Sequence, residues 1–118
     1  MINVASTAQK LSDDYAKLGS WIGLASVNGA DPSGSPLEVP PNAAGYARVQ
    51  TTWSSEGGGV NLGTAVTLNA PAGEYNFMVL HNQSDPSQPG DTLIDYCKID
   101  AILNTDGQIV VIPQYTQT

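Results

Sequence analysis

Basic residues are scarce in this sequence. Lys and Arg together number 4 against 11 Asp and Glu, which gives a formal net charge of −7 at pH 7. So few cations cannot neutralise a row of phosphates or attach the chain to an anionic membrane surface. We therefore expect neither nucleic acid nor a membrane as a partner, and solubility is the simplest explanation of the acidity.

Cysteine and histidine occur once each, as Cys97 and His81. A single cysteine excludes an internal disulfide and a cysteine-rich zinc site within one chain, so we expect Cys97 to be a small buried apolar residue. A Ser-His-Asp arrangement would have to use His81, and the Gly-x-Ser-x-Gly motif that often carries the serine is missing. We therefore predict no catalytic residues and no enzyme activity, and we interpret His81 as a residue at a strand end that caps a loop.

Metal and cofactor signatures are also missing. Asp85, Asp91 and Asp95 lie in or beside one predicted loop, but their spacing differs from that of an EF-hand. The run of three glycines at 57–59 lacks the Lys-Ser/Thr ending of a phosphate-binding loop. We interpret the aspartates as solvated loop acids and expect no metal and no cofactor.

Long apolar runs are absent as well. No run approaches the roughly 18 residues of a transmembrane helix, and the N-terminus lacks the basic and apolar regions of a secretory signal. Synthesis and assembly in a cytoplasm are the simplest expectation.

Glycine and proline, by contrast, are frequent. They number 12 and 8, and apolar residues make up 41 % of the 118 residues, which favours short strands joined by many turns. We predict one domain over residues 1–118, with a helix over about 4–18 and a β region over about 20–115.

The predicted helix has a candidate start and a candidate end. Ser6 precedes Gln9 by the spacing of a capping box, Asn3 is a competing cap, and Gly19 can end the helix in the left-handed conformation. Its apolar face is expected to comprise Ala8, Leu11, Tyr15 and Leu18.

The remainder reads as about six strands. In the clearest of them, even-numbered residues from Val60 to Leu68 alternate with more polar ones, so we expect the even-numbered set to be buried. Pro113 is expected to block further pairing after the last strand. The fold class predicted is an antiparallel β-sandwich or barrel-like roll with one short N-terminal α-helix. The expected strands are 21–27, 46–53, 60–69, 74–81, 93–103 and 108–112.

The segment 28–45 is rich in proline and glycine and is predicted to be a long, extended interaction loop. Arg48, on the strand that follows, is expected to pair with Asp31 or Glu38 and to anchor this loop by a bidentate contact. Replacing Arg48 with alanine should then loosen the loop more than it unfolds the domain. Trp53 and Tyr46 are candidate interface aromatics. The loop residues predicted to make contacts are Asp31, Pro32, Leu37, Glu38 and Val39.

Short motifs follow one another in a fixed order along the first two thirds of the chain. They are Trp-Ile-Gly-Leu-Ala-Ser at 21–26, Ala-Asp-Pro at 30–32, Leu-Glu-Val at 37–39, Gly-Tyr-Ala-Arg-Val at 45–49, Trp53, and Val-Thr-Leu-Asn-Ala-Pro-Ala-Gly at 66–73. The series resembles a group of small tailed-bacteriophage proteins with a "LHtaDPg…nEv…gYaR…W" pattern, often described as tail fibre or minor structural proteins. The chain departs from that pattern at Ala25, where the group has histidine, and over 88–93, where a glycine-rich stretch is replaced.

The resemblance implies a structural role in a phage particle. The leading expectation is a capsid accessory, or decoration, subunit that stabilises contacts between major capsid subunits. Its partners would be the major capsid protein or other virion proteins, it would act as a homo-oligomer, and it would be located in the virion after assembly in the bacterial cytoplasm. A tail-fibre or tail-tip component is the alternative, and a glycan-binding adhesin module is a third class.

Overall fold

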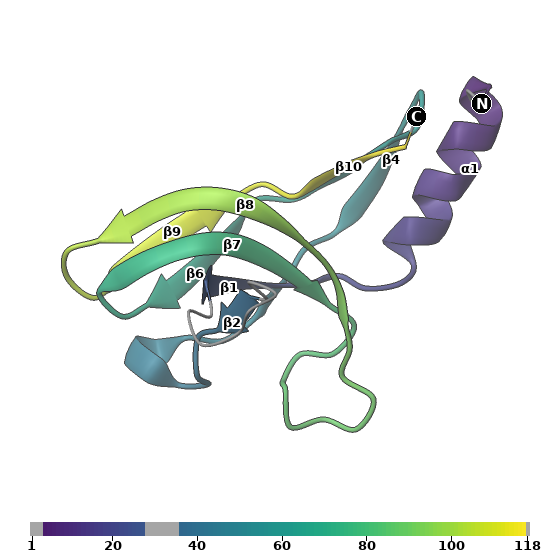
Figure 1. Cartoon of the computed structure of the whole chain (residues 1–118). Coiled ribbons are helices and arrows are strands. Elements are labelled where there is room, and N and C mark those ends of the chain that lie inside the picture. Colours follow the sequence, from purple (N-terminus) through teal and green to yellow (C-terminus); the bar gives the residue numbers. More distant parts are fainter. Residues whose placement is uncertain (1–3, 28–35, 118) are drawn as a thin grey trace.

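The structure is a computed structural model, and it describes residues 4–27 and 36–117. One helix, α1 (Ala5–Ala16), precedes a mainly β region whose paired strands are all antiparallel (Figure 1). The predicted fold class is confirmed, and within the described residues the strands do not close into a barrel. The strands are β1 (Trp21–Val27), β2 (Pro36–Glu38), β3 (Val49–Gln50), β4 (Trp53–Gly57), β5 (Val60–Gly63), β6 (Val66–Ala70), β7 (Gly73–His81), β8 (Leu93–Leu103), β9 (Gly107–Val111) and β10 (Gln114–Thr116), and a 3-10 turn, η1 (Ala43–Gly45), lies before β3.

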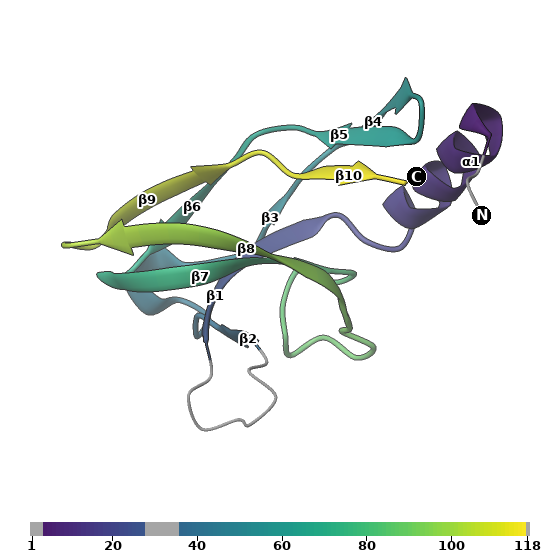
Figure 2. The ribbon, with the colours of Figure 1, turned by 45° about the horizontal axis from the view of Figure 1, so that its top comes forward.

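The strands form three sheets. The largest has the order β2-β1-β7-β8, with β3 also paired to β1; β10-β5-β4 form a second sheet and β6-β9 a third. In Figure 2 the β10-β5-β4 sheet extends away from the other two and lies beside α1. The molecule is accordingly elongated, with extents of 45 × 30 × 30 Å.

The hydrophobic core lies among β1, β6 and β7. On β6 the side chains alternate strictly between buried and exposed, as expected for a strand with one face against the core. The buried cluster comprises Ile22, Leu24, Val39, Tyr46, Val66, Leu68, Ala70, Tyr75 and Leu80.

The strand predicted over 60–69 is in fact two strands, which belong to different sheets. The alternation slips between them: Asn61 is buried and Leu62 is 39 % exposed in β5, whereas the even-numbered residues are buried in β6. The prediction was wrong for β5 because the chain changes sheet at 64–65, where each strand takes a new set of neighbours. Pro113 does not end the pairing either, since its carbonyl accepts a 2.8 Å hydrogen bond from the Gly63 N–H and β10 follows directly.

The ends of α1 also differ from the prediction. Val4 is the N-cap and makes no side-chain hydrogen bond, and the helix ends with a right-handed C-cap at Lys17 rather than at Gly19. Gln9 is not part of a capping box, because its Oε1 accepts from the backbone N–H groups of Gly59 (2.9 Å) and Val60 (3.1 Å). Asn3 lies outside the described residues.

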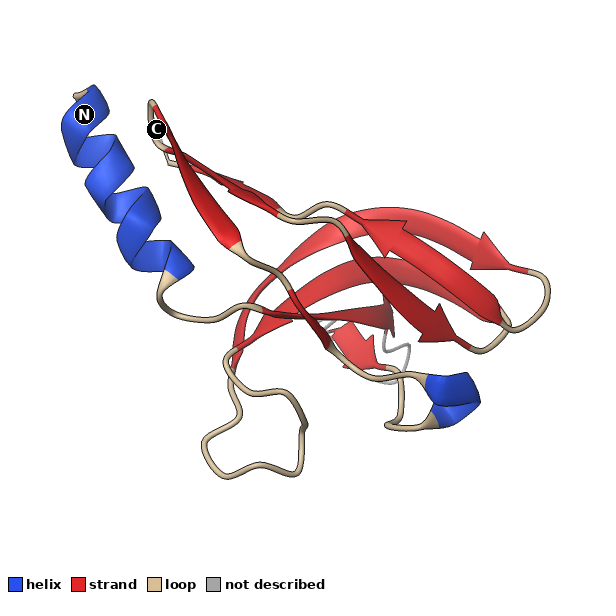
Figure 3. Cartoon of the chain, turned by 180° about the vertical axis from the view of Figure 1, so that it is seen from behind, coloured by secondary structure: helices blue, strands red, loops and turns tan. Residues whose placement is uncertain are grey.

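The buried face of α1 is small and partly polar. Ala8 and Ser12 are buried, whereas Leu11 is 43 % and Leu18 is 55 % exposed, so the predicted apolar face is wrong at two positions. Ser12 Oγ accepts a 2.8 Å hydrogen bond from Asn61 Nδ2 on β5. Figure 3 shows why: the helix lies beside the extended β10-β5-β4 sheet and away from the main core. No helix in the described part of the chain is long and apolar enough to cross a membrane.

Candidate functional site

Four segments of the chain bring ionisable side chains together beside β2. Glu38 ends β2, Arg48 directly precedes β3, His81 ends β7, and Asp91 lies at the end of the loop 82–92 that leads into β8. Together with Tyr46, which follows η1, these residues form what we call the Arg48 cluster.

The Arg48 guanidinium is fully hydrogen-bonded. It binds Glu38 through Nε (2.8 Å to Oε2) and Nη2 (2.7 Å to Oε1), and Asp91 through Nη1 (2.7 Å) and Nη2 (3.1 Å). Nη1 also donates to the Gln83 carbonyl at 2.9 Å, so the five N–H donors of the side chain meet five acceptors. With only 1 % of the Arg48 side chain exposed, these are two bidentate ion pairs shielded from water.

His81 and Tyr46 complete the cluster. His81 Nδ1 lies 3.2 Å from Asp91 Oδ1, and its Nε2 lies 3.9 Å from Glu38 Oε1. The Tyr46 hydroxyl donates to Glu38 Oε2 at 2.7 Å and accepts from the backbone N–H of Leu24 at 3.1 Å. His81 therefore lies at the end of a strand, as expected, and contacts two acids, of which Asp91 belongs to the loop that follows.

Arg48 and the two acids favour the charged state of one another. Burial by itself disfavours the ionised Asp91, but the hydrogen bonds and charge of Arg48 outweigh it and lower the pKa of Asp91 below its ordinary value. Burial likewise opposes the charged guanidinium, yet the two carboxylates raise the pKa of Arg48. Burial and the bond to Glu38 raise the pKa of Tyr46, so its hydroxyl stays protonated and can donate.

Of the predicted loop residues, the structure describes Leu37, Glu38 and Val39. The expected bidentate pairing of Arg48 with Glu38 is present, whereas Asp31 and Pro32 lie outside the described residues. The segment was predicted as loop, but 36–38 form β2, which pairs with β1. Leu37 is 58 % exposed, Val39 only 7 %.

Tyr46 and Trp53 differ as candidate interface aromatics. Tyr46 is 2 % exposed and fully engaged with Glu38 and β1, so it is a core residue and the prediction of an interface position was wrong. Trp53 is half-buried, and its Nε1 donates to the Gly19 carbonyl at 2.9 Å.

Asp91 is the member of the cluster that sequence reasoning missed. It was interpreted as a solvated loop acid, but only 13 % of its side chain is exposed and it pairs with Arg48, which is 43 residues away in sequence. The only local hint is its position beside the closing pair of β7 and β8, where His81 lies opposite Leu93.

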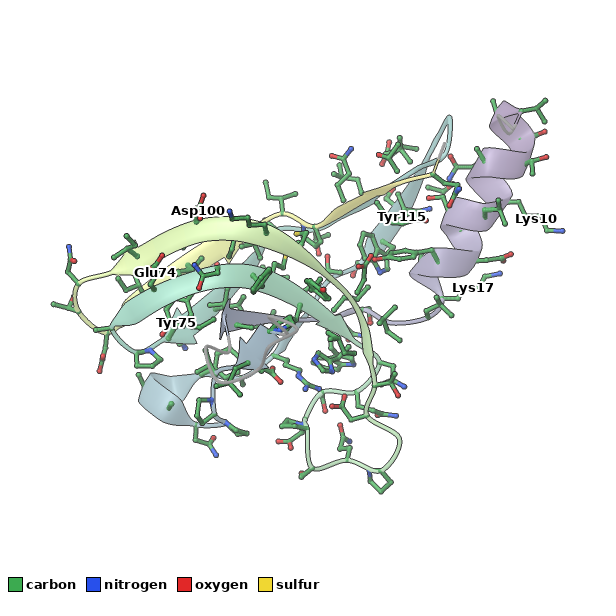
Figure 4. The ribbon with its side chains drawn as sticks, viewed as in Figure 1. Lys10, Lys17, Glu74, Tyr75, Asp100 and Tyr115 are labelled. Atoms are coloured by element: carbon green, nitrogen blue, oxygen red, sulfur yellow. The ribbon has the colours of Figure 1, made fainter. Side chains whose placement is uncertain are left out.

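A second feature, the aromatic groove, lies where β10 and α1 meet β7 and β8. It has a volume of about 70 Å³, and Tyr15 stacks on Tyr115 in it at 3.6 Å between ring centroids. Trp53 packs edge-on against Tyr15 at 6.2 Å, and the Tyr15 hydroxyl donates to Asp95 at 2.9 Å. Figure 4 shows Tyr115 between β10 and α1.

Cys97 also lines this groove and is exposed, so the prediction that it would be a buried apolar residue was wrong. It lies on β8, which among the described residues has a paired strand on one edge only. Partial burial and the nearby carboxylate of Asp95 raise the pKa of the Cys97 thiol, which keeps it protonated and poorly nucleophilic at neutral pH.

Within the described residues, no buried side-chain nitrogen or oxygen lacks a hydrogen-bond partner. In the same part of the chain, no group of three or more His, Cys, Asp or Glu residues could hold a metal ion. The polar groups of the Arg48 cluster are therefore already satisfied by one another, and the geometry is that of an anchor between segments.

No protein-family model matches this chain, and neither a curated protein nor a solved structure matches it. The family resemblance described from the sequence stays a prediction.

Proposed function

We propose that this chain is a non-enzymatic structural subunit of a tailed-bacteriophage particle, and that it is a capsid accessory subunit which stabilises the assembled head. The motif series and its resemblance to small phage structural proteins support the class of protein. The engagement of His81, the only histidine, in the Arg48 cluster supports a role without catalysis.

One observation carries the proposal: an apolar side chain is presented on a firmly anchored edge strand. Leu37 is 58 % exposed on β2, which lies at the end of its sheet. Its neighbour Glu38 is held by Arg48 through two hydrogen bonds of 2.8 and 2.7 Å. An exposed apolar residue on a fixed strand loses little conformational entropy on binding, which suits a docking contact with another virion protein. Many copies then stabilise a lattice by weak contacts that each favour the assembled state.

The test is a density map of the intact particle whose genome encodes the chain, combined with binding of the purified protein to heads that lack it. We expect many copies on the head surface, and we expect Leu37→Asp to bind such heads at least about tenfold more weakly while keeping its melting temperature. Leu11→Asp, at an exposed apolar position on α1, is the matched control and should bind like the wild type. Absence of the protein from heads would refute the proposal.

The aromatic groove favours a second candidate, a tail-fibre or tail-tip component with a glycan-binding role. Stacked tyrosines next to an indole and a carboxylate are the kinds of group on which sugar rings pack and bind. This candidate predicts a few copies in the tail and binding of host surface polysaccharide that Tyr115→Ala abolishes. Ile102→Ala, at an exposed position outside the groove, should leave such binding unchanged.

A further inference from the structure

The outer edge of β8 has no strand partner among the described residues. β8 is the last strand of its sheet, and although it leads into β9 through a short turn, β9 pairs with β6 instead. It is also the longest of the described strands, with 11 residues. A long strand with a free edge offers a row of unpaired backbone N–H and C=O groups and is a template for pairing with another strand.

The side chains of β8 are distributed in a regular way. Tyr96 and Ile102 are 49 % and 70 % exposed, and Lys98 and Asp100 between them are exposed as well. Asp100 projects away from the fold in Figure 4. The odd-numbered residues differ: Ile99, Ala101 and Leu103 pack against the core, and Asp95 and Cys97 line the aromatic groove. Tyr96 also borders the groove, and its ring packs edge-on against Phe77 at 5.4 Å between centroids, with 49 % of the residue exposed. One face of β8 is therefore available and carries charges of both signs.

These charges are self-complementary. When β8 is placed antiparallel to a second β8 with Ile99 opposite Ile99, Lys98 of each copy faces Asp100 of the other. In the same register Tyr96 faces Ile102, again twice. Directly opposed residues of an antiparallel pair lie on the same face, and opposite charges or aromatic-aliphatic pairs at such positions stabilise the pairing.

We propose that β8 pairs with β8 of a second copy of this chain, antiparallel and centred on Ile99, so that two sheets join into one across a twofold axis. Residues 95–103 of both copies then form about eight backbone hydrogen bonds between strands. The ladder between β8 and β7 shifts register next to this centre, between Lys98 and Ala101. Burial still alternates over 98–103, where Ile99, Ala101 and Leu103 are partly buried and the residues between them are exposed. The inference stands independently of the phage assignment, because it concerns only the chain itself.

The first test is charge reversal in the full-length protein, followed by sedimentation equilibrium over a range of protein concentrations. Wild type should be in a monomer–dimer equilibrium. Lys98→Glu puts like charges opposite each other twice. We therefore expect the dissociation constant of the dimer to rise by about tenfold or more. Adding Asp100→Lys to that variant restores opposite charges and should return the dissociation constant to within about threefold of wild type. A protein that stays monomeric at every concentration, or a double variant no better than the single one, overturns the proposal.

The second test fixes the register with cysteine chemistry. In the proposed pairing Cys97 faces Ala101 of the partner, at a Cα separation of about 5 Å that allows a disulfide. Ala101→Cys should therefore give a disulfide-linked dimer on mild oxidation. The two cysteines cannot join within one chain, because four residues of strand separate them by about 13 Å.

Ile102→Cys is the matched control for this cross-link. Ile102 is more exposed than Ala101 but lies on the other face of β8. A cysteine at position 102 should therefore not reach Cys97 of a second copy. Equal cross-linking of Ile102→Cys and Ala101→Cys would show random collision and would overturn the register. A linked dimer with Ala101→Cys alone supports it.

Discussion

Replacing Arg48 with methionine removes the charge and all five donors from the Arg48 cluster but keeps most of the side chain's aliphatic volume. Glu38 and Asp91 are then left without their cation, with side chains only 17 % and 13 % exposed. Removing one partner from such a buried ion pair typically destabilises a protein by about 3–5 kcal/mol. For a chain of this length that corresponds to a fall in melting temperature of roughly 10–20 °C.

The assay is urea unfolding at pH 7, followed by tryptophan fluorescence, together with limited proteolysis of the loop 82–92. The sequence alone predicts that the loss of Arg48 affects a loop more than the whole domain, whereas the burial of the guanidinium raises the effect expected on global stability. Both β2 and the loop 82–92 should become more sensitive to protease, because Glu38, Asp91 and the Gln83 carbonyl lose their shared donor.

Two further variants make this reasoning refutable. Lys17→Met breaks an exposed ion pair with Asp14 at 3.7 Å, and its effect should stay below about 1 kcal/mol. Neutralising both acids in the Arg48→Met background, with Glu38→Gln and Asp91→Asn, should recover much of the lost stability because no buried charge is then unpaired. A loss below about 1 kcal/mol in Arg48→Met, or no recovery in the triple variant, would contradict the role we assign to the buried charges.

Three other predictions follow from the same structure. The pKa of Asp91 is lower in the folded protein than in the unfolded chain, so its stabilising contribution is complete above about pH 4 and is lost as the pH falls through the folded value. Asp91→Asn should therefore make urea midpoints depend less steeply on pH below about pH 4, and parallel curves for the two proteins would contradict this. Gln9→Ala leaves two backbone N–H groups of the β4–β5 connection without their acceptor and should destabilise the docking of α1 by about 1–3 kcal/mol, measured as faster amide hydrogen exchange in the helix. Gly23→Ala places a Cβ 2.8 Å from Glu38 Oε2 and should reduce stability by about 1–3 kcal/mol in thermal unfolding, whereas Gly107→Ala, with its nearest contacts at 3.7 Å, should have little effect.

Local sequence signals performed well where one stretch of chain has one environment throughout. The alternation in β6 identifies its buried face, and the runs at 21–27 and 93–103 coincide with β1 and β8. They failed at 60–69, because alternation says which residues share a face but not which sheet that face belongs to. They also failed for α1, whose contacts with β5 are made largely by Gln9 and Ser12 rather than by an apolar stripe.

In the candidate site, too, one contact could be predicted from the sequence and another could not. Glu38 and Arg48 are ten residues apart, and their pairing could be proposed from opposite charges on neighbouring segments. Asp91 could not be predicted as a partner of Arg48 in this way, since several other acids were equally plausible. The closure of the loop between β7 and β8 decides which acid lies beside Arg48.

The sequence by itself determined that this chain is acidic and mainly β, that it begins with a helix, and that β6 buries one face, because composition and periodicity are properties of short stretches and of the whole chain. Only the tertiary structure decided which acids surround Arg48, where the chain changes sheet, and that β8 is left with a free edge. Those features depend on the order in which distant strands pair, and several orders satisfy the same local pattern of polar and apolar residues.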